Sequence, residues 1–241
     1  MLKKYLQVFL ILMCGFFFLG KESFAQTEFV PPNITWPKEK EIKTDSGRII
    51  PIVEDKQLQQ KIEPIVKDII SVLGPKHQKY EFKLYITDEK QPNAGGTRHG
   101  NNALIIIDRK WAETFSKDEL ALILSHEMGH VVLEAGAWDK VESNMKDKSD
   151  KAKLRREGEK GADALAIEYM KLLEKQKPGE YSIEKGLKFY EKRIISDLKA
   201  IGGDIKDGKL LNPERSHPLY IERVIAMRER AVLPPLLPIA K

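Results

Sequence analysis

The segment 126–130 reads His-Glu-Met-Gly-His, so two histidines stand four positions apart with a glutamate directly after the first. Four residues make slightly more than one helical turn, and His126 and His130 would therefore project from the same face of a helix. Two imidazoles placed in this way can bind one zinc ion. Glu127 would then lie beside the metal, where its carboxylate can take a proton from a metal-bound water. A buried histidine pair that only satisfies backbone carbonyls is the alternative.

The residues around the motif predict the helix that this geometry needs. Ser116 is followed three positions later by Glu119, which is the pattern of a capping box at a helix start. Gly136 stands where a glycine commonly closes a helix. The sequence therefore predicts a helix over 117–135 that carries both histidines and Glu127.

A catalytic zinc site needs a third protein ligand and one open position. A thiolate is excluded, because the only cysteine, Cys14, lies far upstream in an apolar run. Helical periodicity returns after Ser149, which we expect to be the N-cap, and there Glu159 and Asp163 share one face. We assign Glu159 to the metal and Asp163 to the free ring N–H of a ligand histidine.

The alternative for these two acids is an ordinary solvated, charged helix face. We favour the metal site because Glu159 follows His130 by 29 residues, in a second helix that could pack on the first. Gly158 and Gly161 support this interpretation. Each glycine lowers helix propensity by about 1 kcal/mol relative to alanine, so a close approach between the two helices is the expected reason for them.

The combination of the 126–130 motif with Glu159-Lys-Gly-Ala-Asp163 resembles the gluzincin peptidases of the HtpX and CAAX prenyl protease type. The block Ser216-His217-Pro218, with Arg223 five residues after Pro218, resembles the third motif of that family. The resemblance implies that Glu159 is the third zinc ligand and that Asp163 orients a zinc histidine. It also implies that His217 is an oxyanion donor and that Arg223 orients the site. A plain helix start at Pro218 is an equal alternative for His217.

Asn93-Ala94 resembles the start of the edge strand that binds substrate in gluzincins. Backbone groups of such a strand would pair with an extended peptide. The glycines that follow, Gly95, Gly96 and Gly100, also fit an ordinary glycine-rich turn between two strands, which is the interpretation that we slightly favour, and His99 would then be an exposed turn residue.

Residues 1–25 read as a secretory signal, with a basic start, an apolar stretch too short for a typical span and a small-x-small site before Gln26. Export to the periplasm or the medium is therefore expected, with a membrane anchor only if the leader stays uncleaved. No spanning segment is apparent after residue 20, so the resemblance is to soluble exported members of the family. The formal net charge is +5, and without the leader, which carries three lysines and one glutamate, it would be +3. This weakly basic balance indicates no nucleic-acid partner.

The order of helix, strands and then helices predicts an α+β fold, with a small antiparallel sheet packed on a mostly helical half. With the resemblance, this becomes a zincin-like metallopeptidase domain over residues 55–231. An extended arm over 26–54 is expected before it, and a proline-rich tail over 232–241 after it.

The resulting hypothesis is a zinc endopeptidase with one Zn²⁺ per chain, bound by His126, His130 and Glu159, and a protein or peptide as substrate. A metalloprotease-like chaperone of the cell envelope with little turnover is the alternative, although such a protein would have no need of Glu127. A zinc hydrolase with a non-peptide substrate is a third possibility. The sequence does not fix the substrate, the native metal or the oligomeric state.

Overall fold

The computed structural model describes residues 33–43, 47–133, 141–142, 144–201, 205–206, 209–210 and 218–234, with 195–201, 205–206 and 209–210 described by their backbone alone. The expected leader and the end of the proline-rich tail lie outside these residues. The elements are β1 (Asn33–Thr35), β2 (Glu41–Lys43), β3 (Ile49–Pro51), α2 (Lys56–Ser71), α3 (Pro75–Gln78), β4 (Glu81–Thr87), β5 (Ala94–His99), β6 (Asn102–Asp108), α4 (Arg109–Thr114), α5 (Lys117–Val132), α7 (Lys148–Gln176), α8 (Ile183–Ile201), β7 (Ile205–Lys206), β8 (Lys209–Leu210) and α9 (Tyr220–Ala231).

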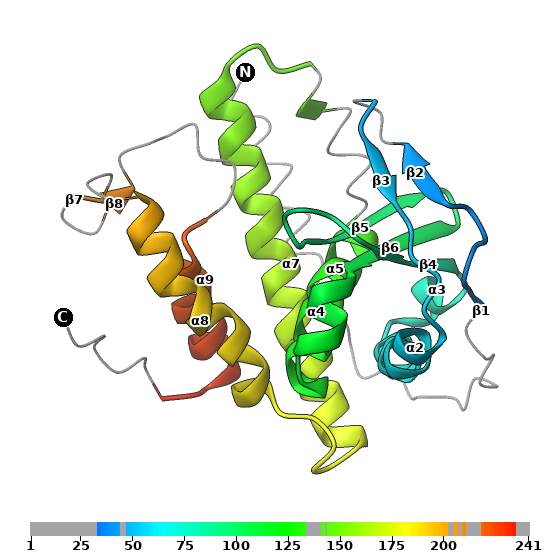
Figure 1. Ribbon diagram of the computed structural model, residues 1–241. Helices are drawn as coiled ribbons and strands as arrows, with labels where there is room; N and C mark the ends of the chain where they lie inside the picture. Colours follow the sequence, from blue (N-terminus) through cyan, green and yellow to red (C-terminus); the bar gives the residue numbers. More distant parts are fainter. Residues whose placement is uncertain are drawn as a thin grey trace. The chain divides into compact units, whose positions relative to one another are not determined.

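The main sheet has four strands in the order β1-β4-β6-β5, and helices make up most of the rest of the described chain (Figure 1). This confirms the α+β class. The sheet is mixed rather than antiparallel, because β1 and β6 both run parallel to β4 and only β5 pairs antiparallel with β6. After β4 the chain first forms the edge strand β5, and a tight hairpin then returns β6 to the place beside β4. The buried, nearly continuous apolar run of β6 suits this inner position.

The segment before α2, expected as an extended arm, contributes to the sheet. Its first described strand, β1, pairs with β4 from Asn33 opposite Glu81 to Thr35 opposite Lys83. Farther on, the Val53 N–H donates to the Ile86 carbonyl at 2.8 Å. Backbone pairing of this kind fixes the segment against the domain instead of leaving it separate.

Helix α5, which carries the 126–130 motif, lies at the centre of the described fold. It contacts β5 and β6 of the sheet as well as α2, α7 and α8. Consequently, residues on all sides of it are buried, including Leu120, Leu124 and Met128. A helix surrounded in this way holds its polar side chains in a protein-lined environment.

The helix limits agree with the sequence signals at some ends and not at others. Ser116 and Glu119 form the expected capping box at the start of α5, but the helix ends at Val132, before the expected residue 135. Gly136 lies outside the described residues. Helix α7 begins two residues earlier than expected, because Asp147 rather than Ser149 is the N-cap, and its carboxylate accepts from the Ser149 backbone N–H at 2.7 Å. Aspartate and serine are both favoured at the N-cap, and here Asp147 takes the position, which leaves Ser149 inside the first turn.

The close contact between α5 and α7 is made at Gly129 and Ala162. A Cβ atom added to Gly129 would lie 2.9 Å from both the Cα atom and the carbonyl oxygen of Ala162. Gly161, expected to make the approach, would meet only the end of the Leu133 side chain at 3.0 Å, and Gly158 would meet nothing within 4 Å. The glycine that lets the helices approach is thus inside the motif helix itself.

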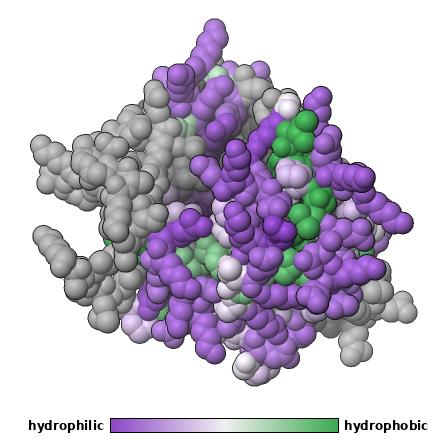
Figure 2. Space-filling model, in the orientation of Figure 1, coloured by the Kyte–Doolittle hydropathy of each residue, from purple (hydrophilic) through white to green (hydrophobic). Residues whose placement is uncertain are grey.

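The surface in the view of Figure 2 is mostly hydrophilic, with a hydrophobic strip in the region of β2 and β3. Ile49 of β3 is 56% exposed. No helix in the described part of the chain combines the length and the apolar character that crossing a membrane requires.

Two glycine substitutions test the contact between α5 and α7. Gly129→Ala should lower the free energy of unfolding by about 1–3 kcal/mol, because the added methyl group would overlap the Ala162 backbone. Gly158→Ala should raise it by about 0.5–1 kcal/mol, because open space accepts the methyl group and alanine favours the helix. Urea denaturation of the chelator-treated full chain measures both. Equal effects of the two substitutions would contradict this view of the interface.

Candidate metal centre

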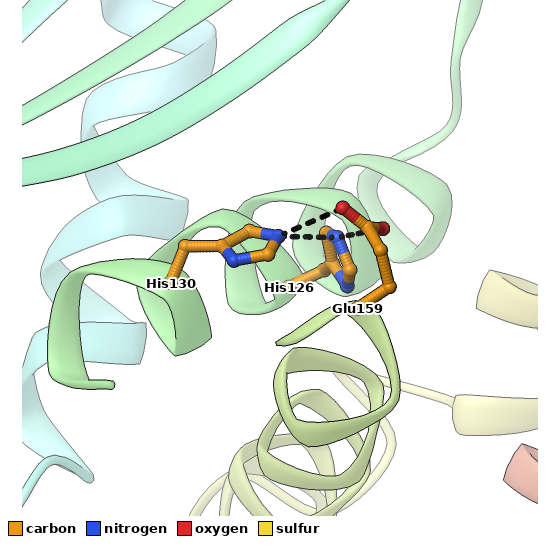
Figure 3. A group of neighbouring side chains, drawn as sticks. All are labelled: His126, His130 and Glu159. Carbon is orange, nitrogen blue, oxygen red and sulfur yellow. Dashed lines mark hydrogen bonds and ion pairs between the residues drawn. The ribbon is translucent and has the colours of Figure 1, made fainter. Parts of the chain in front are cut away.

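His126, His130 and Glu159 converge at one point between α5 and α7 (Figure 3). The Nε2 atoms of the two histidines are 3.1 Å apart. Oxygens of the Glu159 carboxylate lie 3.4 Å from Nε2 of His126 and 3.5 Å from Nε2 of His130. The helical spacing within α5 aligns the two rings, and the packing of α7 supplies the carboxylate.

The distances between these donors fit a zinc ion. Zinc binds imidazole nitrogen and carboxylate oxygen at about 2.0–2.2 Å in tetrahedral geometry, which places neighbouring ligand atoms about 3.3–3.5 Å apart. The Nε2–Nε2 distance of 3.1 Å and the contacts of 3.4 Å from Oε2 to His126 and 3.5 Å from Oε1 to His130 are close to this spacing, with a different carboxylate oxygen facing each histidine. Two neutral nitrogen donors and one carboxylate are also a donor set that zinc commonly takes, and they leave a fourth position open.

A buried ion pair holds the first histidine in place. Nδ1 of His126 donates to Oδ1 of Asp163 at 2.9 Å, which leaves Nε2 as the ring nitrogen that faces Glu159. Asp163 also accepts two hydrogen bonds from Arg223 of α9, from Nε at 2.8 Å and from Nη2 at 2.6 Å. The Arg223 Nη1 atom lies 3.6 Å from Oε2 of Glu159. The guanidinium of Arg223 thus links α9 to both Asp163 and Glu159 of α7.

Burial and ion pairing shift the pKa values of these side chains in opposite directions. Burial and the Arg223 charge lower the pKa of His126, but Asp163 and Glu159 outweigh them and raise it to about 9. Burial also disfavours the ionised carboxylates. Even so, the two histidines hold the pKa of Glu159 far below its usual range, and Arg223 and His126 lower the pKa of Asp163. Each buried charge is therefore kept by a neighbour of opposite sign.

Glu127 lies next to the cluster and is only 8% exposed. Burial raises the pKa of its carboxyl group, while the charges of His126 and His130 oppose that rise. A carboxylate with a raised pKa is a better proton acceptor than an exposed one, which is the property that a general base needs.

Asn93 and Ala94 do stand at the start of an edge strand. Gly95 and Gly96 belong to β5 itself, so the glycine-rich-turn interpretation is wrong for them, and the turn comes only after His99. Strand β5 passes very close to α5 at Gly96. The approach is so close that a Cβ atom on Gly96 would overlap the carbonyl oxygen of Glu127. Cross-strand pairing with β6 and this contact with the helix decide the conformation of the glycines.

The metal-binding cluster, Glu127 and the start of β5 line one cavity of about 600 Å³. Sequence reasoning missed the side chains that line it away from the motif, because their apolar spacing looks like ordinary core packing. The lining residues are Asn93, Ala94, Gly95, Gly96, Trp111, Ile123, His126, Glu127, His130, Glu159, Phe189, Tyr190, Pro218, Tyr220 and Arg223.

The third motif of the resemblance is only partly described. Arg223 lines the cavity and joins the cluster through Asp163. His217 lies outside the described residues, and its suggested role as an oxyanion donor stays a prediction.

Residues 56–138 match the model of peptidase family M48, which supports the resemblance to the HtpX and CAAX prenyl protease family and a metallopeptidase function. M48 metallopeptidases use zinc, in agreement with the donor set described above. The matched segment includes α5 and β5 but not Glu159, so the place of that carboxylate beside the histidines comes from the fold.

Among solved structures, the chain is similar to S. mikatae Ste24p at 17% sequence identity and a TM-score of 0.42. The match covers 74% of this chain and 50% of that one, so the chain spans about half of the length of this structure.

Asp163→Asn tests how the metal centre is held. We expect zinc affinity to fall by about 10- to 100-fold, because the neutral amide no longer balances Arg223 or holds His126 as firmly. Competition with a chromophoric chelator measures the change. Glu157→Gln is the matched control, since this acid of α7 is paired with Lys160 at the surface. Unchanged affinity in the Asp163 variant would show that the ion pair serves the fold alone.

Proposed function

We propose that this protein is a zinc-dependent endopeptidase that cleaves exported proteins or peptides. The observation that carries the proposal is the convergence of His126, His130 and Glu159 beside Glu127, in a cavity bordered by an edge strand. The match to peptidase family M48 supports the same chemistry. The setting outside the cytoplasm rests on the leader-like residues 1–25.

In this proposal His126, His130 and Glu159 hold one zinc ion per chain. Zinc, when bound, supplies a Lewis acid that polarises the peptide carbonyl and lowers the pKa of water to about 7. Asp163 keeps the proton on Nδ1 of His126, so that Nε2 presents its lone pair to the metal. Arg223 balances the negative charge of the two α7 carboxylates.

Glu127 moves the proton. Its carboxylate takes a proton from the attacking water while the water oxygen forms a bond to the peptide carbonyl carbon. The same carboxyl group then returns the proton to the amine nitrogen as the C–N bond breaks. The raised pKa of buried Glu127 suits both transfers.

Strand β5 binds the substrate in an extended form. It is the last strand of the sheet order, so one of its edges has no strand partner in the described sheet. Residues 93–96 at its start line the cavity. A peptide can pair with this edge as an added strand and thereby place a carbonyl group next to Glu127. His217, if it acts as the family resemblance implies, would stabilise the developing oxyanion.

Glu127→Gln tests the general base. Zinc content should stay equal to that of the wild type, while kcat for quenched fluorescent casein should fall by about 100- to 10,000-fold, because the amide cannot accept the proton. Glu184→Gln, a surface change in the first turn of α8, is the control. Cleavage at the wild-type rate by the Glu127 variant would exclude the mechanism. A zinc-loaded wild type that binds unfolded proteins without cleaving them would favour the chaperone alternative.

A further inference from the structure

Aromatic rings from three helices lie in contact along the cavity. Trp111 of α4 packs edge-on against Phe189 of α8 at 5.1 Å between ring centroids, and Phe189 packs against Tyr190 at 4.9 Å. Tyr190 in turn lies 5.9 Å from Tyr220 of α9. All four side chains line the same cavity as the histidine–glutamate cluster. A substrate bound beside the cluster therefore meets an aromatic wall.

The part of this wall formed by Trp111 and Phe189 is apolar. Ile123 also lines the cavity and stands three residues before His126, close to one turn earlier on α5. Tyr190, by contrast, is engaged by Arg223, whose Nη2 donates to the Tyr190 hydroxyl at 3.3 Å. A large apolar side chain of a substrate would bury its surface best against the rings of Trp111 and Phe189.

A cation covers these same two rings. The Cζ atom of Arg193 lies 5.4 Å from the ring centroid of Trp111 and 5.5 Å from that of Phe189. Arg193 follows Phe189 by four residues and so lies on the same face of α8. Within the described part of the chain, its recorded contacts are with these rings and include no carboxylate.

Two arginines of α9 differ in this respect. Arg223 is paired with Asp163, and Arg228 is paired with Glu191 at 2.8 Å. A guanidinium stacked on aromatic faces keeps the N–H groups at its edge available for hydrogen bonds, and these groups match the two oxygens of a carboxylate. Arg193 does not itself line the cavity, but the two rings that it covers do. The charge that would complement Arg193 can therefore come from a substrate residue that neighbours the side chain bound against these rings.

We propose that Arg193 is a specificity-determining residue that binds a carboxylate of the substrate, next to a large apolar side chain held by Trp111 and Phe189. The preferred substrates are then peptides in which an aspartate or glutamate neighbours a bulky apolar residue. This inference rests on the proposed peptidase function, because it assigns a substrate preference to the same site. It concerns peptide binding, however, and can be tested without measuring cleavage.

The test measures peptide binding to the zinc-loaded full chain carrying Glu127→Gln, by fluorescence anisotropy. Two labelled peptides differ only in Glu or Gln beside a phenylalanine. We expect the Glu peptide to bind about three- to tenfold more tightly at low salt, with a smaller ratio at high salt. Adding Arg193→Gln should bring the ratio to about one. Adding Arg193→Glu should reverse the preference, so that a third peptide with Lys at the same position binds more tightly than the Glu peptide.

Lys188→Gln is the matched control, because this lysine is an exposed cation on the same helix, next to Phe189 in sequence. It should leave the ratio unchanged, and Arg193→Lys should keep part of the preference. Thermal melts show whether each variant is folded, and the ratio compares two peptides on one protein, so a general loss of affinity cancels.

The possible outcomes separate this inference from the proposed function. A ratio near one in the parent protein, or a ratio that survives Arg193→Gln, overturns the role of Arg193 even if the wild type cleaves casein. A ratio that depends on Arg193 supports the role, and it does so even if the wild type cleaves no peptide, in which case only the peptidase proposal fails.

Discussion

Helices α5 and α7 meet at Gly129 and Ala162, and the metal centre depends on this contact. The backbones approach so closely that a Cβ atom on Gly129 would overlap Ala162. Gly129 immediately precedes His130, and Ala162 immediately precedes Asp163. The contact therefore lies in the same turns as the functional side chains, and it sets the distance between the histidines of one helix and the carboxylates of the other. A larger residue at this point would separate the donors that zinc needs to have about 3.3–3.5 Å apart.

The charged side chains at the contact between α5 and α7 pair with one another and do not act independently. His126, Glu159, Asp163 and Arg223 are buried or largely buried and pair with one another. Removing any one of them leaves a charged partner buried without a counter-charge. The resulting loss in free energy of unfolding is larger than the contribution of an exposed ion pair. Arg223 extends the group to α9, so the position of this helix is linked to the orientation of His126.

Two surfaces of different chemistry border the centre. On one side the backbone of β5 passes against α5 at Gly96 and offers hydrogen-bonding groups that do not depend on the side chains of a substrate. The rings of Trp111 and Phe189, with Arg193 over them, offer contacts that do depend on those side chains. General affinity for extended chains and selectivity among them would thus come from separate elements of the fold.

The sequence by itself determined the local features: the spacing of His126 and His130 on one helix face, the capping box at Ser116 and the α+β class. These depend on neighbours within one turn or on periodicity, which the sequence contains directly. Only the tertiary structure decided that β6 lies inside a mixed sheet, that Gly129 rather than Gly158 makes the helix contact, and that Trp111, Phe189 and Arg193 come together. Those outcomes depend on which distant segments pack against each other, and buried aromatic residues at helical spacing look the same in a sequence whether they fill a core or line a cavity.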